Sequence, residues 1–277
     1  MIMLMKMLQI KRYNRQMKIQ LEQYLKTNWL GKNIVYEEIV ESTNAYAKML
    51  GEENVMDGTV VVAGKQTAGR GRRGRSWISP EGNCYFSLLL RTTIQMEHAS
   101  RLTLVTAIAL AEAIKNVSCL ETKIKWPNDV VVNGKKLCGI LTESSIDGNG
   151  LKYVVIGVGV NVNQKEFDTE IASMATSISL QLKRDIECAK LIAEFLNCFE
   201  VYFETFLKTE DLSMLMCQYN ELLVNRDQEV RVIDRSERVG VAIGIDASGE
   251  LLVRNTDGMI EKVISGEVSV RGMYGYV

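Results

Sequence analysis

Residues 123–143 read KIKWPNDVVVNGKKLCGILTE, and this stretch carries the clearest fold signal in the chain. Two runs rich in β-branched and other apolar residues flank the pair Asn133-Gly134. An Asn-Gly pair in that position is the strongest short-range signal for a β-hairpin, because both residues tolerate the positive φ angles of the turn. The stretch therefore predicts a hairpin, with Pro127 holding Trp126 extended just before it.

Strand and helix patterns continue on both sides of this hairpin. Buried strands are expected at 58–66, 83–92 and 153–162, and NIVYEEIVES at 33–42 reads as a strand followed by a helix that starts at Ser42 or Thr43. A buried helix is expected at 100–117 with Ser100 as its N-cap, and an amphipathic helix at 186–208. Strands first, one inserted helix and then further helices predict an α+β domain.

The pattern changes near residue 226. Five short strands (EVRVID, VGVAIGID, LLVRN, MIEKVIS and VSVR) follow one another with turn signals between them, which predicts a small β-barrel. We therefore expect an N-terminal helical extension at 1–33, a main domain at 34–225 and a barrel domain at 226–277.

Composition excludes several classes of protein. The chain has 277 residues, of which 47% are hydrophobic and 24% charged, close to the average for a soluble globular protein. The net charge of -1 provides no basic field for nucleic acid, and no run of 18 apolar residues could span a membrane. In the opening MIMLMKMLQI the basic cluster follows the apolar run, the wrong order for a signal peptide. We expect a cytoplasmic protein with no DNA or membrane partner.

Cysteine and histidine usage narrows the chemistry. The six cysteines form no C-x-x-C pair, so zinc and redox motifs are not supported, and buried reduced thiols are favoured over disulfides. The only histidine, His98, lies in the polar segment QMEHAS and is expected to be a solvated loop residue. An enzyme with this sequence therefore works without a histidine base.

The segment KQTAGRGRRGRSW at 65–77 concentrates positive charge. It contains five cations and three glycines and no acid. Glycines let a backbone approach an anion closely, and arginine forks bind phosphate or carboxylate oxygens in pairs. We interpret the segment as an anion-binding loop; a solvated charged loop and an RGG-type nucleic-acid segment remain alternatives.

Two further groups of residues suit nucleotide chemistry. Asp129 and Lys136 lie on either side of the predicted hairpin turn. At such a place the carboxylate could hold magnesium and the lysine could hold a phosphate. The alternative is a plain turn with a surface lysine. Strand alternation predicts that Lys136, Cys138 and Ile140 share one face. The run GVGVN at 157–161 lacks the third glycine of a dinucleotide fingerprint, so a strand pressed against a flat ligand or a neighbouring backbone is favoured.

Taken together and in order, these segments resemble the biotin–protein ligases. The resemblance is carried by STN at 42–44, QTAGRGRRGR at 66–75, KWPND at 125–129, KKLCGIL at 135–141, GVGVN at 157–161 and GEVSVR at 266–271. It covers roughly residues 33–277. It implies a class II synthetase-like catalytic fold, with a mixed β-sheet packed with helices, followed by an SH3-like barrel.

The resemblance also implies an activity. The family joins biotin to ATP, giving biotinyl-5′-AMP and pyrophosphate, and then passes the biotinyl group to one lysine of a biotin carboxyl carrier domain in a biotin-dependent carboxylase such as acetyl-CoA carboxylase. A lipoate–protein ligase and a biotin-responsive DNA-binding repressor are the alternatives. Only 41 residues precede Ser42, too few for the winged helix-turn-helix of regulatory members, so we expect the monofunctional type. Relatives also form homodimers through sheet edges, a state left open for this chain.

Site roles follow from the same motifs. Arg70, Arg72 and Lys136 are expected to be catalytic, and Asp129 to bind Mg²⁺. The residues expected at biotin are Ser42, Thr43, Asn44, Gln66, Gly69, Arg70, Gly71, Arg72, Trp77, Tyr85, Lys136, Gly139, Leu141, Gly157 and Gly159. Those expected at ATP are Arg70, Arg72, Arg75, Lys136, Asn161 and Arg271.

Overall fold

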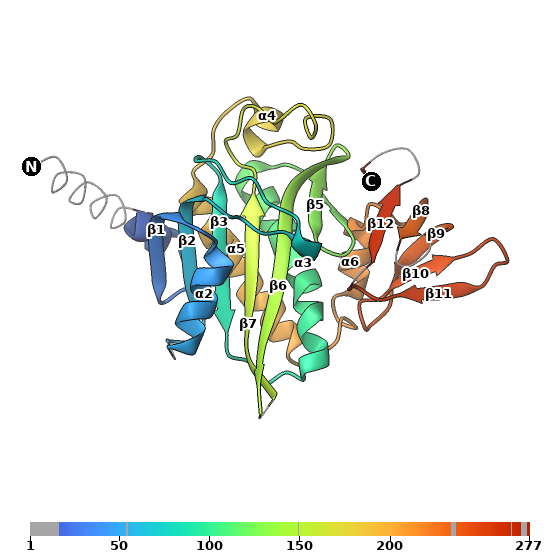
Figure 1. Cartoon of the computed structure of the whole chain (residues 1–277), viewed down its shortest axis with the longest axis horizontal. Helices are drawn as coiled ribbons and strands as arrows, with labels where there is room; N and C mark the ends of the chain where they lie inside the picture. The colour runs from blue at the N-terminus through green and yellow to red at the C-terminus, as the bar shows by residue number, and fades with distance from the viewer. Residues whose placement is uncertain (1–16, 54, 149, 234–236, 267, 273–275) are drawn as a thin grey trace, which may run out of the picture.

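The structure is a computed structural model that describes residues 17–53, 55–148, 150–233, 237–266, 268–272 and 276–277. A sheet with helices on both faces occupies most of the chain, and a smaller β-domain lies beside one end of that sheet (Figure 1). The helical pattern expected in the N-terminal segment is observed at 17–24. Residues 1–16 of that expected extension lie outside the described residues.

The larger sheet has seven strands over the described residues, in the order β1-β2-β3-β7-β6-β5-β4. The strands are β1 (Ile34–Val40), β2 (Thr59–Gln66), β3 (Cys84–Leu90), β4 (Lys123–Lys125), β5 (Asp129–Val132), β6 (Lys135–Asp147) and β7 (Gly150–Val160). The β1–β2 pair is parallel and the other pairs are antiparallel. The predicted α+β fold with a mixed sheet is therefore confirmed.

The helices cover both faces of this sheet (Figure 1). They are α2 (Thr43–Glu52), α3 (Leu102–Ser118), α4 (Ile178–Leu182), α5 (Cys188–Phe206) and α6 (Met216–Leu222), with 3-10 turns η1 (Arg72–Gly74) and η2 (Met96–Arg101). Alternation along β3 explains the two layers, because Phe86 and Leu88 pack in the core with α3 and α5, whereas Leu89 packs with α2.

Two local predictions near α3 are wrong. The helix begins at Leu102 directly after η2, so Ser100 lies inside a 3-10 turn and is not an N-cap. A tight turn that runs straight into a helix leaves no extended residue to act as the cap. His98 is not a solvated loop residue either: it lies in η2, and its Nδ1 is 3.0 Å from Oε2 of Glu210.

The Asn133-Gly134 hairpin is confirmed, with φ angles of 49° and 72° at the two turn residues. The prediction that Lys136, Cys138 and Ile140 share one face is confirmed for Cys138 and Ile140, which both pack in the core, but it is wrong for Lys136. The register shifts so that Val130 pairs with Cys138 while Val131 pairs with Lys136, a β-bulge that leaves an extra residue on β6. Cys138 therefore packs in the core, and Lys136 faces the opposite side of the sheet.

The C-terminal domain is a five-stranded antiparallel sheet over its described residues, in the order β11-β10-β9-β8-β12. Its strands are β8 (Gln228–Ile233), β9 (Glu237–Ile245), β10 (Leu251–Arg254), β11 (Ile260–Val263) and β12 (Ser269–Gly272), which matches the five predicted strands. The indole of Trp126 donates to the carbonyl of Gly249 at 3.0 Å and so fixes this domain to the larger one.

Two features of the described residues concern membrane spans and cysteines. No helix in this part of the chain is long and apolar enough to cross a bilayer. All six cysteines lie in the described ranges as free thiols, as expected, and three of them (Cys84, Cys138 and Cys198) are buried.

A buried carboxylate holds the segment before β1 against α5. Glu200 of α5 accepts hydrogen bonds from the backbone N–H groups of residues 28, 29 and 30 at 2.6, 3.1 and 2.9 Å. Its side chain is only 4% exposed, and Leu30 beside it is fully buried in the main core. The carboxylate therefore satisfies three backbone donors, one of which belongs to the buried Leu30.

Glu200→Ala should lower the free energy of unfolding by about 3 kcal/mol, because three backbone N–H groups, one of them on the buried Leu30, lose their acceptor at once. Urea unfolding measures this change. Glu204→Ala, on the exposed side of the same helix, is the matched control and should change stability by less than about 0.5 kcal/mol. Equal stability of the two variants would contradict this role.

Candidate active site

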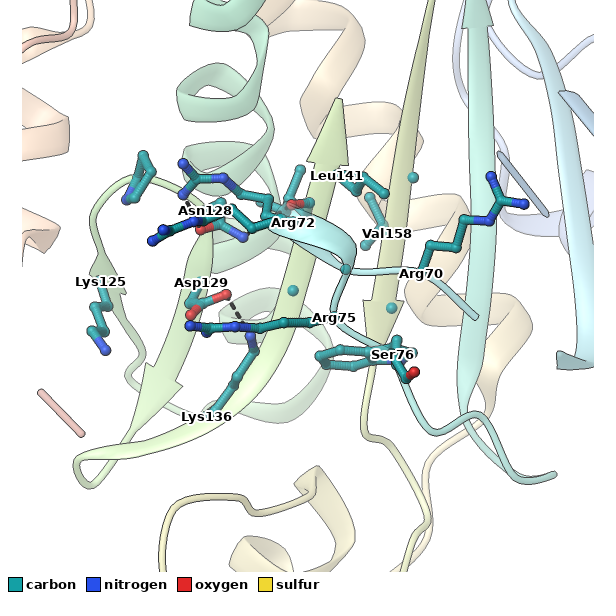
Figure 2. Close-up of a pocket in the computed structure, with 18 of the residues that line it drawn as sticks. Arg70, Arg72, Arg75, Ser76, Lys125, Asn128, Asp129, Lys136, Leu141 and Val158 are labelled. Carbon is teal, nitrogen blue, oxygen red and sulfur yellow. Dashed lines mark hydrogen bonds and ion pairs between the residues drawn. The ribbon is translucent and has the colours of Figure 1, made fainter. Parts of the chain in front are cut away.

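A pocket lies on the face of β6 and β7 that α3 and α5 do not cover. Loop residues 70–77 form one wall, the turn 125–129 forms another, and β12 together with Tyr276 closes it from the C-terminal domain. Figure 2 shows Arg72 and Arg75 directed toward Asn128 and Asp129, whereas Arg70 points to the other side of the loop. Segments far apart in the sequence thus meet around one cavity.

Most of the residues expected at the site line this pocket. They are Ser42, Thr43, Asn44, Gln66, Arg70, Gly71, Arg72, Arg75, Trp77, Asp129, Lys136, Gly139, Leu141, Gly157, Gly159 and Arg271.

Three expected residues lie behind the pocket wall. A Cβ at Gly69 would lie 2.4 Å from the carbonyl oxygen of Trp77, so this glycine lets the loop fold back on itself. Tyr85 is fully buried and donates to the carbonyl of Pro80 at 2.8 Å. The amide of Asn161 donates to the carbonyl of Thr176 at 3.0 Å. All three support the site from outside the cavity.

The start of α2 provides a polar end to the pocket. Ser42 occupies the N-cap position in extended conformation, but its side chain makes no capping hydrogen bond. The backbone N–H and the hydroxyl of Thr43 both donate to Oε1 of Gln66, at 2.9 and 3.1 Å. Several donors and acceptors are thus held in place at the edge of the cavity, while the Ser42 hydroxyl keeps its capacity to bond.

The Asn44 amide is fixed in one orientation. Its nitrogen donates to the carbonyl of Leu141 at 3.1 Å and to Glu143 at 2.7 Å, and its oxygen lies 2.6 Å from the hydroxyl of the buried Ser87. A Cβ at Gly157 would lie 2.0 Å from that oxygen. Gly157 is therefore needed for Asn44 to lie across β7.

Trp77 makes the flat wall of the pocket. Its indole lies over two glycines of neighbouring strands, because a Cβ at Gly139 or Gly159 would come within 2.9 or 2.6 Å of the ring. The GVGVN strand was expected to press against a flat ligand or a neighbouring backbone, but at Gly159 it packs against the Trp77 side chain. The indole N–H is buried without a hydrogen-bond partner, and such a donor is costly until an acceptor reaches it.

Arg72 connects the loop to both domains. Its guanidinium donates to the side-chain oxygen of Asn128 at 2.9 Å and to the carbonyl of Gly266 at 2.8 Å. Burial lowers the pKa of Arg72, and Asp129 acts in the opposite direction. A half-buried guanidinium with only neutral hydrogen-bond partners gains from an anion placed beside it.

The charge of the lining is strongly unbalanced. Among the described residues that line the pocket, seven side chains are cationic and Asp129 is acidic. Lys136 reaches Asp129 with Nζ 2.7 Å from Oδ1 (Figure 2), and the hydroxyl of Tyr276 donates to Oδ2. Such a pocket suits a ligand with several negative charges.

Lys125 is the most deeply buried of these cations. Its Nζ lies 3.5 Å from the ring centroid of Tyr276, and burial lowers the pKa of Lys125 to about 8. The neighbouring Lys136, Arg271 and Arg75 act in the same direction, and Asp129 opposes them.

A resident metal site is not supported by the donor set. The described residues contain no group of three or more His, Cys, Asp or Glu side chains that could hold an ion. Mg²⁺ commonly binds through one or two carboxylates together with substrate phosphates and water. The single carboxylate of Asp129 fits an ion that arrives on a polyphosphate better than one held by the protein alone.

Sequence reasoning missed several residues of the pocket. Asn128 lines the pocket and bonds to Arg72. Its polar side chain inside the KWPND motif could have indicated a site residue. Ser87 does not line the pocket but holds the Asn44 amide from behind it, and it is a polar residue within an otherwise apolar strand. Tyr276 lies outside every motif and had no local signal.

Comparisons with known families agree with the two-part architecture. The "Biotin/lipoate A/B protein ligase family" matches residues 36–161. The "Biotin protein ligase C terminal domain" matches residues 227–271.

Two curated relatives are similar to this chain, one over most of it and the other over less than half. The "Bifunctional ligase/repressor BirA" of Bacillus subtilis is 37% identical over 250 residues, which is 89% of this chain and 76% of the relative. The "Biotin--[acetyl-CoA-carboxylase] ligase" of Paracoccus denitrificans is 44% identical over 125 residues, 44% of this chain and 51% of the relative.

The structure of "Biotin protein ligase from Aquifex aeolicus in complex with biotin and ATP" superposes with a TM-score of 0.77 at 31% identity, covering 87% of this chain and 99% of that one. Fold, motif order and relatives all agree: the chain belongs to the biotin/lipoate A/B protein ligase family.

Proposed function

We propose that this protein activates biotin with ATP to biotinyl-5′-AMP and transfers the biotinyl group to a lysine of a biotin carboxyl carrier domain. One observation carries the proposal: a single pocket joins a flat glycine-and-tryptophan slot to a cluster of cations. The slot suits a compact apolar ring system, and the cations suit a carboxylate beside a triphosphate. The family relatives named as biotin ligases support the same assignment.

Biotin would lie along β7 with its polar ring at the start of α2. Ser42, Thr43 and Asn44 offer hydrogen-bonding groups of both kinds, which a ureido group requires. The ring system would lie beside the Trp77 indole, which covers Gly159, and the Asn44 amide, which covers Gly157. The valeryl chain would then lead the carboxylate toward the cationic loop.

The first reaction joins two anions. A carboxylate oxygen of biotin attacks the α-phosphorus of ATP, an O–P bond forms, and the bond to the departing pyrophosphate breaks. Arg70, Arg72 and Lys136 would neutralise the carboxylate and the phosphates. Holding the two reactants in line can lower the barrier by about 7–11 kcal/mol. This chemistry needs no enzyme nucleophile, which fits a chain with one histidine.

The second reaction moves the acyl group. The neutral amine of the carrier lysine attacks the acyl carbon, the bond from that carbon to the AMP oxygen breaks, and the amine loses a proton to solvent. AMP leaves with one oxygen that came from biotin. The cations that held the phosphate during activation would stabilise AMP as it leaves.

ATP would lie between the two domains. Arg75 and Arg271 would contact its phosphates, with Arg70, Arg72 and Lys136 beside them. Mg²⁺ would arrive with the nucleotide as part of the substrate, and Asp129 would be its one protein contact. The boundary near Asn225, a homodimer and the absence of a DNA partner remain proposals.

ATP-dependent transfer of labelled biotin to a purified carrier domain tests the function. A lipoate–protein ligase would instead be stabilised thermally by lipoate with ATP and would transfer lipoate. A repressor would shift an operator fragment in a gel when biotin is present. Transfer of lipoate alone, or no transfer of either cofactor, would overturn the proposal.

Lys136→Ala should impair adenylation far more than biotin binding. Its ammonium lies beside Asp129 and 5.2 Å from the Trp77 ring, where charge develops on the reacting phosphate. Loss of one such group typically lowers the rate about 10²–10³-fold. Pyrophosphate release at saturating substrates measures the rate, and calorimetry measures biotin affinity.

Lys135→Ala is the control for that variant, because Lys135 reaches the carbonyl of Ala172 outside the pocket. It should leave both quantities unchanged. A collapse of biotin affinity in Lys136→Ala, with an unchanged saturated rate, would show that the assigned role is wrong.

Arg271→Ala should weaken ATP use and leave biotin affinity intact, because β12 brings this arginine to the pocket from the second domain. Loss of one charged hydrogen bond to phosphate costs about 1.5–3 kcal/mol, so the ATP KM should rise by about one to two orders of magnitude. Steady-state kinetics over ATP concentration measures the change. Arg254→Ala, an exposed arginine of β10, should have no effect. An unchanged ATP dependence in Arg271→Ala would remove this arginine from the nucleotide site.

ATP binding should weaken as the pH rises through 8. The pKa of Lys125 is lowered to about 8, and only its protonated form attracts phosphate. Above pH 8 each unit should raise the ATP KM by up to about tenfold. Lys125→Arg keeps its charge and should show a flatter profile. The same rise in Lys125→Arg would assign the titration to another group.

A further inference from the structure

Tyr276 occupies the cationic end of the pocket although it lies outside every motif. Its hydroxyl donates to Oδ2 of Asp129, and its ring lies under the Lys125 ammonium at 3.5 Å. Both partners belong to the KWPND turn, and all three residues line the same cavity. Tyr276 therefore contacts the two charged groups of that turn.

These contacts take the places at Asp129 and Lys125 that a magnesium ion and a nucleotide phosphate would otherwise occupy. Asp129 already pairs through Oδ1 with Lys136 at 2.7 Å, so the Tyr276 hydroxyl engages its remaining oxygen. The electron-rich ring face offers Lys125 a partial substitute for an anion. Burial and the neighbouring Asp129 raise the pKa of Tyr276 well above its usual value, which keeps the hydroxyl a neutral donor.

The neighbouring residue shows how closely this segment fits. The side chain of Val277 lies 3.5 Å from the position of a Cβ at Gly134, in the turn between β5 and β6. Its carbonyl oxygen lies only 2.0 Å from the position of a Cβ at Gly272 in β12. Two glycines thus leave space for this segment beside the pocket, and Tyr276 is held there by backbone packing as well as by its own side chain.

We propose that Tyr276 is a self-supplied occupant of the nucleotide subsite, which holds Asp129 and Lys125 while the site is empty and must be displaced when ATP binds. The inference rests on the proposed function, because it takes the KWPND turn as part of the ATP site. Tyr276 thereby sets the affinity for ATP: the apparent dissociation constant equals the intrinsic one divided by the fraction of molecules in which the subsite is open. A residue that instead contacts ATP would have the opposite effect when removed.

Calorimetric titration with MgATP in the absence of biotin tests this inference without any turnover. Tyr276→Ala should bind ATP about tenfold more tightly than the unaltered protein, since the competing side chain is gone. Tyr276→Phe, which keeps the ring and loses the hydroxyl, should bind about threefold more tightly. Biotin affinity should not change in either variant.

Tyr24→Phe is the matched control. The Tyr24 hydroxyl also donates to a carboxylate, that of Glu187 at 3.1 Å, but on an exposed surface outside the pocket. This variant should bind ATP as the unaltered protein does.

Weaker or unchanged ATP binding in Tyr276→Ala, with a normal melting temperature, would overturn the inference. If Tyr276→Ala does not fold, the same comparison with Tyr276→Phe decides. Fluorotyrosine labelling provides a direct second measurement: the fluorine signal that disappears in Tyr276→Phe should shift when ATP is added and stay in place with biotin alone. An unshifted signal with ATP bound would also overturn it.

Ligand binding by the unaltered protein separates failure of the proposed function from failure of this inference. An unaltered protein that binds neither biotin nor ATP would overturn the proposed function and this inference with it. If the unaltered protein binds biotin and ATP but the Tyr276 variants bind ATP with unchanged affinity, only the displacement of Tyr276 would be overturned.

Discussion

The Arg72 guanidinium joins the three segments that close the pocket. It extends from the glycine-rich loop, donates to Asn128 of the KWPND turn and donates to the carbonyl of Gly266 in the C-terminal domain. A planar fork with fixed donors can bridge two acceptors in this way, which a lysine cannot do in the same geometry. The Arg72 side chain thus contacts all three segments around the ligand site and, together with the Trp126–Gly249 hydrogen bond, holds the second domain beside the turn.

The slot beside it depends on the absence of side chains. Gly139 and Gly159 admit the Trp77 ring, and Gly157 admits the Asn44 amide, each at a distance that a Cβ would forbid. The sheet therefore provides a flat surface where other strands would present methyl groups. The cationic loop and the flat surface formed by Trp77 and the glycines meet along β6 and β7. One pocket could therefore hold an apolar ring system and a polyphosphate together.

The parts of the fold that could be predicted from sequence are those with local causes. The Asn133-Gly134 turn could be predicted because its own two residues tolerate the positive φ angles that it requires. Close packing against β7 could be predicted because its glycines leave room for a neighbouring group. Most of the site could be named because its residues fall within a few short motifs. The bulge before Cys138 could not be predicted, since strand periodicity contains no sign of an extra residue.

Contacts between distant residues were missed for a related reason. His98 pairs with Glu210, and Asp129 with Tyr276, across 112 and 147 positions of sequence. Only tertiary packing brings these pairs together, within the main domain for His98 and Glu210 and between the two domains for Asp129 and Tyr276, and no spacing rule covers such separations.

The central claim is that the pocket activates a carboxylate as an acyl adenylate. Biotin labelled with oxygen-18 in its carboxylate tests it directly, when the protein is supplied with ATP and a carrier domain and the released AMP is analysed by mass spectrometry. The account predicts one labelled oxygen in AMP and none in pyrophosphate. AMP without the label, alongside a biotinylated carrier, would contradict it.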